Sequence, residues 1–218
     1  MTIVLRAGTS HDTTMQRFRS YAEALRQLPS WVHPSWRDSF GIGLAATTTP
    51  AGAARLAVAL GVETPDAEAF DHAAHRIAAL PSRLVCRVLR TRGLLRHRPA
   101  LRRCLDQSVR GRLAEWVHPT VFETILRESS DGMERDADGL PLPGAEAVPD
   151  SLAWEGFCLF ERDGVWSERG LLQWLRLGFA KNLGRPSDLD DFPGARDGSA
   201  WVVQRLDRLV PEAPWLCG

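Results

Sequence analysis

Residues 84–116 read LVCRVLRTRGLLRHRPALRRCLDQSVRGRLAEW, and this stretch decides the fold class. Its leucines and valines recur every three or four residues, the period at which side chains share one face of an α-helix. Pro99 divides the stretch, because proline disfavours the helical conformation in the residue before it. We therefore predict two amphipathic helices, the second with an apolar stripe of Leu101, Leu105, Val109, Leu113 and Trp116.

Similar patterns on both sides of this stretch predict further helices. The pairs Thr49-Pro50 and Thr64-Pro65 each place a capping side chain before a first-turn proline, whose missing N–H costs nothing there. Ser167 is a third candidate cap, and the pair of tryptophans in WVHPSW (31–36) flanks a proline in an ordered turn. The predicted helices cover about 15–28, 50–60, 65–80, 122–126, 167–183 and 199–210.

Three segments depart from this helical pattern. Residues 129–150 (SSDGMERDADGLPLPGAEAVPD) are acidic and rich in Pro and Gly, so we predict a flexible loop. Residues 157–166, with Asp163-Gly164 as a turn, are compatible with one small β-hairpin. Residues 1–12 are a candidate disordered N-terminus. The predicted fold class is therefore mainly α: one compact multi-helix domain over residues 1–218, with the acidic Pro/Gly-rich loop and the hairpin.

Composition places the chain among ordinary globular proteins. Its 218 residues carry 27 basic and 27 acidic side chains, so no overall charge draws it to nucleic acid or to a membrane. The four cysteines form no CxxC pair, and no apolar run approaches the roughly 18 residues of a membrane span. The apolar run near the N-terminus, residues 3–5, is too short for a signal peptide. We expect a soluble cytoplasmic protein.

Motifs for catalysis, cofactors or metals are weak or missing. Residues 41–46 (GIGLAA) match the glycine pattern of dinucleotide-binding turns, and Glu63 lies at the spacing of the ribose contact. The preceding residues HPSWRDSF cannot form the strand that this fingerprint requires, so a flexible joint is the better interpretation. His72 and His75 have the spacing of metal ligands but no second ligand pair, which favours a solvated polar face. We expect no catalytic residue, no cofactor and no metal.

The distribution of charge is the unusual feature of the sequence. Residues 83–112 hold ten arginines and one acid, whereas residues 128–163 hold ten acids and two arginines. Three interpretations compete. The arginines fill solvated helix faces and are partly neutralised by the acidic stretch, or they bind nucleic acid, or their guanidinium groups bind carboxylates on an acidic protein surface.

Three stretches of the chain resemble a known family. They are RVLRTRGLLRHRPALRRCLDQSVRGRLAEWVHPTVFETIL (87–126), WVHPSW (31–36) and GFCLFERDGVW (156–166), and the most diagnostic element is LRRCLD (101–106) followed by Arg110. They are similar to the SctK family, the sorting-platform accessory proteins of bacterial type III secretion, in the Hrp branch of plant-associated bacteria. The resemblance implies a helical, non-enzymatic adaptor at the cytoplasmic face of the inner membrane. Its expected partners are the cytoplasmic domain of the inner-membrane ring and the pod protein, which organises substrates and the export ATPase.

For this adaptor we predict a docking face on the basic helix pair, formed by Arg98, Arg102, Arg103, Asp106 and Arg110. Asp106 follows Arg102 by four residues, and on one helix it would hold that arginine in place. The adaptor needs no nucleic acid. The alternative is a small nucleic-acid-binding regulator that uses residues 83–112. An uncharacterised enzyme or a secretion chaperone are further alternatives.

Overall fold

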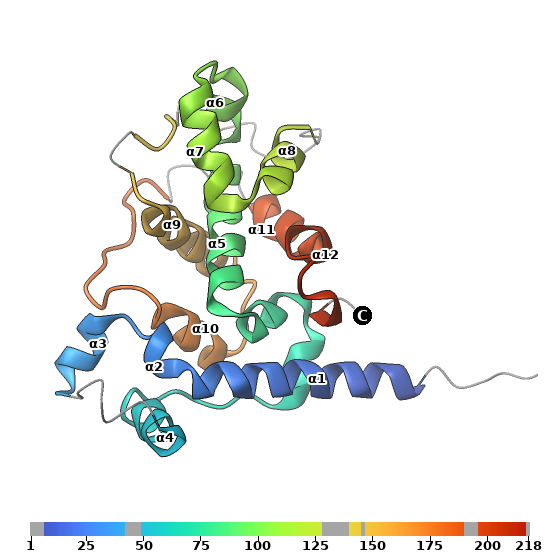
Figure 1. Ribbon diagram of the computed structural model, residues 1–218, viewed down its shortest axis with the longest axis vertical. Coiled ribbons are helices and arrows are strands. Elements are labelled where there is room, and N and C mark those ends of the chain that lie inside the picture. Colours follow the sequence, from blue (N-terminus) through green and yellow to red (C-terminus); the bar gives the residue numbers. More distant parts are fainter. Residues whose placement is uncertain (1–6, 42–48, 128–139, 145–146, 190–195, 217–218) are drawn as a thin grey trace, which may run out of the picture. The chain divides into compact units, whose positions relative to one another are not determined.

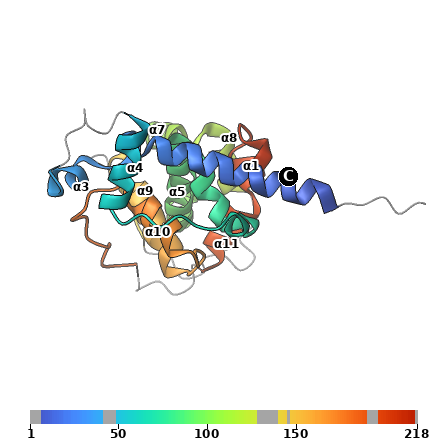
Figure 2. The same ribbon diagram turned by 90° about the horizontal axis from the view of Figure 1, so that it is seen from below.

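The computed structural model describes residues 7–41, 49–127, 140–144, 147–189 and 196–216 (Figures 1 and 2). Helices make up the regular secondary structure of these residues, which include no β-strand, so the prediction of a mainly α fold is confirmed. The chain divides into two compact units. Unit 1 comprises residues 1–82, 166–183 and 211–218, and unit 2 comprises residues 83–165 and 184–210. The expectation that both belong to one domain stays a prediction.

Unit 1 is organised around its longest helix, α1 (Ala7–Arg26). Helix α4 lies beside the C-terminal end of α1 (Figure 2). The Tyr21 ring of α1 is fully buried, and its centroid lies 5.3 Å from that of Phe70 and 6.1 Å from that of Trp174. The other elements of unit 1 are α2 (Leu28–Trp31), α3 (Pro34–Ser39), α4 (Pro50–Ala59), η2 (Ala67–Asp71), η3 (Ala73–Ala79), α10 (Arg169–Arg176) and η5 (Pro214–Leu216).

Local capping chemistry explains which helices of unit 1 the sequence predicts. Thr49 Oγ1 accepts a hydrogen bond from the Gly52 amide at 3.1 Å, and Pro50 opens α4 as expected. The long helix predicted for residues 65–80 is wrong, because the chain forms the short 3-10 helices η2 and η3 there. Ser167 does not cap α10. Instead, its amide donates to Nε2 of His75 at 3.2 Å.

The turn WVHPSW is ordered, as predicted, because both of its indoles donate to the segment 166–183. Trp31 Nε1 donates to the Trp174 carbonyl, and Trp36 Nε1 donates to the Phe179 carbonyl, each at 2.8 Å. The His33 amide adds a third bond to the Leu177 carbonyl at 2.9 Å. These three bonds hold residues 31–36 against a segment more than 130 residues later in the chain.

Unit 2 is built on the close packing of two helices, α5 (Ser82–Arg96) and α9 (Pro149–Arg162). A Cβ atom added to Gly156 would lie 1.8 Å from the Leu89 carbonyl oxygen, and one added to Gly93 would lie 2.4 Å from the Leu152 carbonyl oxygen. Only glycine therefore allows the two backbones to approach so closely. The remaining helices are α6 (Arg98–Arg103), α7 (Gln107–Val117), α8 (Pro119–Arg127), α11 (Arg196–Gln204) and α12 (Leu206–Leu209).

The β-hairpin expected at residues 157–166 is wrong, because helix α9 continues to Arg162. Its apolar residues are buried on all sides, and such a run cannot be assigned to a strand or a helix from its pattern alone. Gly164 adopts φ +65°, and its amide donates to the Glu161 carbonyl at 3.1 Å, as expected at a helix C-terminus. The Asp-Gly pair ends a helix instead of turning a hairpin.

The expected stripe at residues 101–116 is also interrupted. Helix α6 ends at Arg103, and α7 begins at Gln107 with Asp106 as its N-cap (Figure 1). The Asp106 carboxylate accepts from the Ser108 and Val109 amides at 2.8 and 3.3 Å. Leu105 lies in the resulting turn with 89% of its surface exposed, whereas Leu101 and Leu113 are fully buried. The break therefore removes Leu105 from the core.

The ends of the chain and the acidic loop are described in part. Residues 7–12, which we expected to be disordered with residues 1–6, belong to α1, and residues 1–6 lie outside the described residues. Most of the predicted flexible loop, residues 129–139 and 145–146, also lies outside them, as do residues 42–46 of the glycine motif. Among the described residues, no helix combines the length and the apolar character that crossing a membrane requires.

Candidate protein-docking surface

Several of the arginines in residues 83–112 are internal to unit 2. Arg92, Arg96 and Arg98 are each at most 3% exposed, and Arg87 and Arg90 are half-buried. Arg92 and Arg96 follow Leu89 at the spacing of the buried helix face, so the helical period itself places them in the interior. The segment therefore does not form one continuous basic stripe on the surface.

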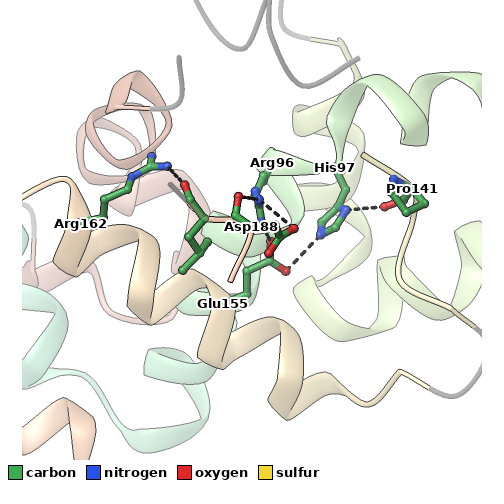
Figure 3. Close-up of polar contacts among 7 residues, drawn as sticks. Arg96, His97, Pro141, Glu155, Arg162 and Asp188 are labelled. Carbon is green, nitrogen blue, oxygen red and sulfur yellow. Dashed lines mark hydrogen bonds and ion pairs between the residues drawn. The ribbon is translucent and has the colours of Figure 1, made fainter. Parts of the chain in front are cut away.

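Arg96 is the centre of one buried ion-pair network (Figure 3). Its guanidinium group donates to Glu155 Oε1 at 2.8 Å, and to the carbonyl and carboxylate oxygens of Asp188 at 2.7 and 3.1 Å. The ring nitrogens of His97 lie 2.7 Å from the Pro141 carbonyl oxygen and 3.1 Å from Glu155 Oε2. Burial raises the pKa of Glu155, but the hydrogen bonds and charges of His97 and Arg96 outweigh it and leave that pKa lowered.

Arg92 is the centre of a second network. Its Nε donates to Ser199 Oγ at 2.8 Å, and its guanidinium lies 3.2 Å from the buried carboxylate of Asp163. The Ser199 hydroxyl donates to the same carboxylate, and Arg162 approaches the other carboxylate oxygen at 2.8 Å. A Cβ at Gly198 would lie 2.8 Å from Arg92 Cζ, so the chain fits closely around the guanidinium.

The acids in these pairs come largely from the acidic stretch of the sequence. Arg90 pairs with Asp150, Arg96 with Glu155 and Arg92 with Asp163. The charge asymmetry between residues 83–112 and 128–163 is thus partly neutralised inside unit 2. This outcome agrees with one of the three interpretations of the sequence, except that Arg92 and Arg96 are buried and Arg90 is half-buried, instead of solvated.

Among the predicted docking residues, Arg98 is buried, whereas Arg102, Arg103 and Asp106 are exposed. Arg98 is 3% exposed and therefore does not belong to a docking face, which corrects its assignment. Arg102 and Arg103 are exposed at the end of α6, and Asp106 is exposed at the start of α7. The turn between α6 and α7 brings these residues together with Leu105 and Arg110. We call this group of five the α6–α7 corner.

Asp106 does not hold Arg102, because the two residues lie on separate helices. Hydrogen bonds from Ser108 lower the pKa of the Asp106 carboxyl, with a further one from the Val109 amide, so the capping carboxylate stays ionised. Arg102 instead donates to the Leu126 carbonyl of α8 at 3.2 Å. The pairing predicted from four-residue spacing is wrong, since a helix boundary separates the partners.

Arg110 fixes the other side of the corner. Its guanidinium donates to the Cys104 carbonyl at 3.4 Å and lies 5.8 Å from the centroid of the Phe122 ring. This hydrogen bond and the Asp106 cap together fix the backbone of the turn that carries the exposed Leu105. The sequence pattern places Leu105 on one apolar stripe with Leu101, although an Asp directly after Leu105 is a recognised signal for a helix start.

The histidine pair does not form a site, and the segment before the glycine motif is helical. His75 is buried, with Nδ1 2.7 Å from the Ala69 carbonyl oxygen, so its assignment to a solvated face is wrong. Burial lowers the pKa of His75, with an opposing contribution from that carbonyl. Residues 34–39, before the glycine motif, form α3 and not a strand. Within the described ranges, no cluster of His, Cys, Asp and Glu is arranged to hold a metal ion.

The fold and the α6–α7 corner define a helical protein with a candidate surface for binding other proteins. Residues 8–212 match the family model described as bacterial type III secretion protein (HrpB4), and the chain belongs to this family. Membership gives the protein a role in type III secretion and partners within the secretion apparatus. No curated protein matches the chain. The search of solved structures likewise gives no match.

Proposed function

We propose that this protein is a non-enzymatic adaptor of the type III secretion sorting platform. It links the cytoplasmic domain of the inner-membrane ring to the pod protein and the export ATPase assembly, and the α6–α7 corner is one of its docking faces. In this role it works at the cytoplasmic face of the inner membrane and is held there by its partners. Membership in the HrpB4 family supports the secretion role.

The exposure of Leu105 is the observation that supports the docking face. Leu105 is 89% exposed, yet the backbone on both sides of it is held by the Asp106 cap and by the bond from Arg110 to Cys104. An ordered turn holds this large apolar side chain in water, so the side chain is stabilised only when a partner covers it. Full burial of a leucine contributes roughly 1.5–3 kcal/mol of favourable free energy. The side chains that become fully desolvated at the centre of an interface carry much of its binding energy, and arginine is enriched among them.

The arginines beside Leu105 define the chemistry of the partner surface. Arg102 and Arg103 are exposed next to the leucine, and arginine guanidinium groups bind carboxylates through two parallel hydrogen bonds. The complementary surface is therefore an apolar depression bordered by Asp or Glu side chains. Binding to it should weaken as salt rises, because the exposed charges are screened.

The nucleic-acid-binding alternative has less support. Phosphate binding needs several basic side chains on one accessible face, and each neutralised phosphate adds to the salt dependence. Burial removes Arg92, Arg96 and Arg98 from any such face. The arginines of the α6–α7 corner alone could neutralise only a few phosphates.

A tagged pull-down from the native bacterium tests the proposal. The wild-type chain should recover the inner-membrane ring protein and the pod protein, and the variant Arg102→Glu/Arg103→Glu should lose at least one of them. The matched control, Arg55→Glu/Arg83→Glu, makes the same change in net charge at two other exposed arginines and should retain both partners. Equal recovery with both variants would contradict the docking face. Recovery of nucleic acid without either protein would contradict the adaptor role.

A further inference from the structure

The ring of His97 lies between two oxygen acceptors in unit 2 (Figure 3). Its Nδ1 lies 2.7 Å from the Pro141 carbonyl oxygen, and its Nε2 lies 3.1 Å from Glu155 Oε2. A neutral imidazole carries one N–H and one lone pair, whereas the imidazolium carries an N–H on each nitrogen. A carbonyl oxygen and an ionised carboxylate oxygen can only accept. Both contacts are therefore hydrogen bonds only when each ring nitrogen carries a proton.

The other way to satisfy the second contact is a protonated Glu155 that donates to a neutral ring, and the surroundings of Glu155 oppose it. Arg96 donates to Glu155 Oε1 at 2.8 Å. Burial raises the pKa of Glu155, but the hydrogen bonds and charges of His97 and Arg96 leave that pKa lowered. The carboxylate therefore stays ionised in the neutral range, and the proton between the two groups belongs to His97.

The charged groups packed around the ring come from three elements. Glu155 of α9 stabilises the imidazolium. Arg96 of α5 and Arg98 of α6, its two neighbours in the chain, oppose it, but Arg96 is itself paired with Glu155 and Asp188. The segment 140–144 (LPLPG) contributes no ionisable side chain. Glu155 is therefore the group that favours the charged ring.

The segment 140–144 is anchored to unit 2 at both of its ends. Leu140 is buried, with 8% of its surface exposed. The Arg112 guanidinium group of α7 donates to the Gly144 carbonyl at 3.2 Å, in a bond exposed to solvent. The bond from His97 to this segment is better shielded from water, because His97 is 7% exposed. Losing a shielded hydrogen bond costs more than losing an exposed one, where water replaces the partner.

We propose that His97 is a pH-sensitive latch for residues 140–144. When the ring is doubly protonated it donates to both oxygens, and the segment is held. As the pH rises through the range in which histidine titrates, the ring loses one proton. The remaining N–H stays on Nε2, because a hydrogen bond to an ionised carboxylate is stronger than one to a neutral carbonyl. Nδ1 then presents a lone pair to the Pro141 carbonyl oxygen, and the segment loosens.

The sign of this effect is opposite to that expected for His75. The folded protein binds the charged form of His97, so the stabilisation is present at low pH and is lost as the pH rises. His75 is buried and accepts from Ser167, so the folded protein favours its neutral form. The latch does not depend on the adaptor proposal, which concerns the α6–α7 corner.

Nuclear magnetic resonance of the full chain, labelled with ¹⁵N, tests the latch without any substitution. The shifts of the two ring nitrogens report which of them carries a proton. At about pH 6 we expect His97 to be doubly protonated, and at about pH 8.5 to be neutral with its proton on Nε2. Over the same interval, the heteronuclear NOE of the Leu142 and Gly144 amides should fall, because it reports fast backbone motion.

A matched pair of variants assigns the effect to His97. Glutamine does not titrate, so His97→Gln should remove the pH dependence of the NOE at Leu142 and Gly144. His118→Gln changes an exposed histidine of the same unit and should keep it. If His97→Gln loses helical circular dichroism, the wild-type spectra decide alone. A neutral His97 ring at about pH 6, a proton kept on Nδ1 at about pH 8.5, an NOE that does not change, or an unchanged pH dependence in His97→Gln would overturn the inference.

Discussion

Replacing Gly156 by alanine should destabilise the protein, although alanine is the better helix former. In an exposed helix, this replacement favours the helix by about 1 kcal/mol. At residue 156, however, the new Cβ would lie 1.8 Å from the carbonyl oxygen of Leu89, so the backbones of α5 and α9 must separate. Overpacking of this kind costs about 1–3 kcal/mol, and more where the obstacle is backbone. We therefore expect the free energy of unfolding to fall by about 1–3 kcal/mol.

Gly111→Ala is the matched control, because Gly111 is exposed within α7 and an added Cβ there would meet nothing within 4 Å. Urea unfolding followed by circular dichroism at the helical band measures both variants. We expect the unfolding midpoint to fall for Gly156→Ala and to rise slightly for Gly111→Ala. An equal rise for both would refute the close packing of α5 against α9 on which unit 2 is built.

Three further predictions follow from burial and charge. Arg96→Met should lower the free energy of unfolding, by up to about 3–5 kcal/mol, because the largely buried Glu155 loses its arginine partner and keeps only His97. The exposed Arg83→Met should change the urea midpoint little, and similar midpoints for the two variants would contradict the buried network. Because burial lowers the folded-state pKa of His75 below its ordinary 6.5, the unfolded chain takes up this proton first as the pH falls. Stability measured by urea titration should therefore decline below about pH 6.5 toward the folded-state pKa, and His75→Gln should reduce that decline; an unchanged slope would exclude His75 as its source. Leu105→Ala should change the free energy of unfolding by less than about 0.5 kcal/mol and Leu101→Ala should lower it by about 2–5 kcal/mol, so equal losses would show that both leucines are buried.

The parts of the fold that depend on local chemistry were predictable from the sequence. Thr49-Pro50 starts a helix because the Thr49 hydroxyl caps the first turn and the fixed φ of Pro50 is already helical, and both effects act within one turn. The sequence of the α9 segment is compatible with a hairpin because a run that is buried on all sides carries no alternation to separate strand from helix. Gly156 permits the close packing of α9 against α5 through a contact with Leu89, 67 positions away. No local sequence pattern reveals this contact.

The candidate site was predictable in position but not in detail. The arginine-rich helix pair does carry an exposed corner with Arg102 and Arg103. The three- and four-residue spacing continues across the α6–α7 boundary, so the sequence pattern places the central residue of the site, Leu105, on one stripe with the buried Leu101 and Leu113. The burial of Arg92 depends on Asp163, which is 71 residues away, and such a pairing is set by the tertiary fold.

The adaptor proposal rests on Leu105 as a docking anchor, and the variant Leu105→Asp tests it most directly. The matched control is Val58→Asp, which places the same charge on another exposed apolar residue, in unit 1. Both variants should keep the wild-type circular dichroism and urea midpoint. In pull-downs from the native bacterium, Leu105→Asp should lose the inner-membrane ring protein or the pod protein, and Val58→Asp should recover both. Full recovery of both partners by Leu105→Asp would contradict the account.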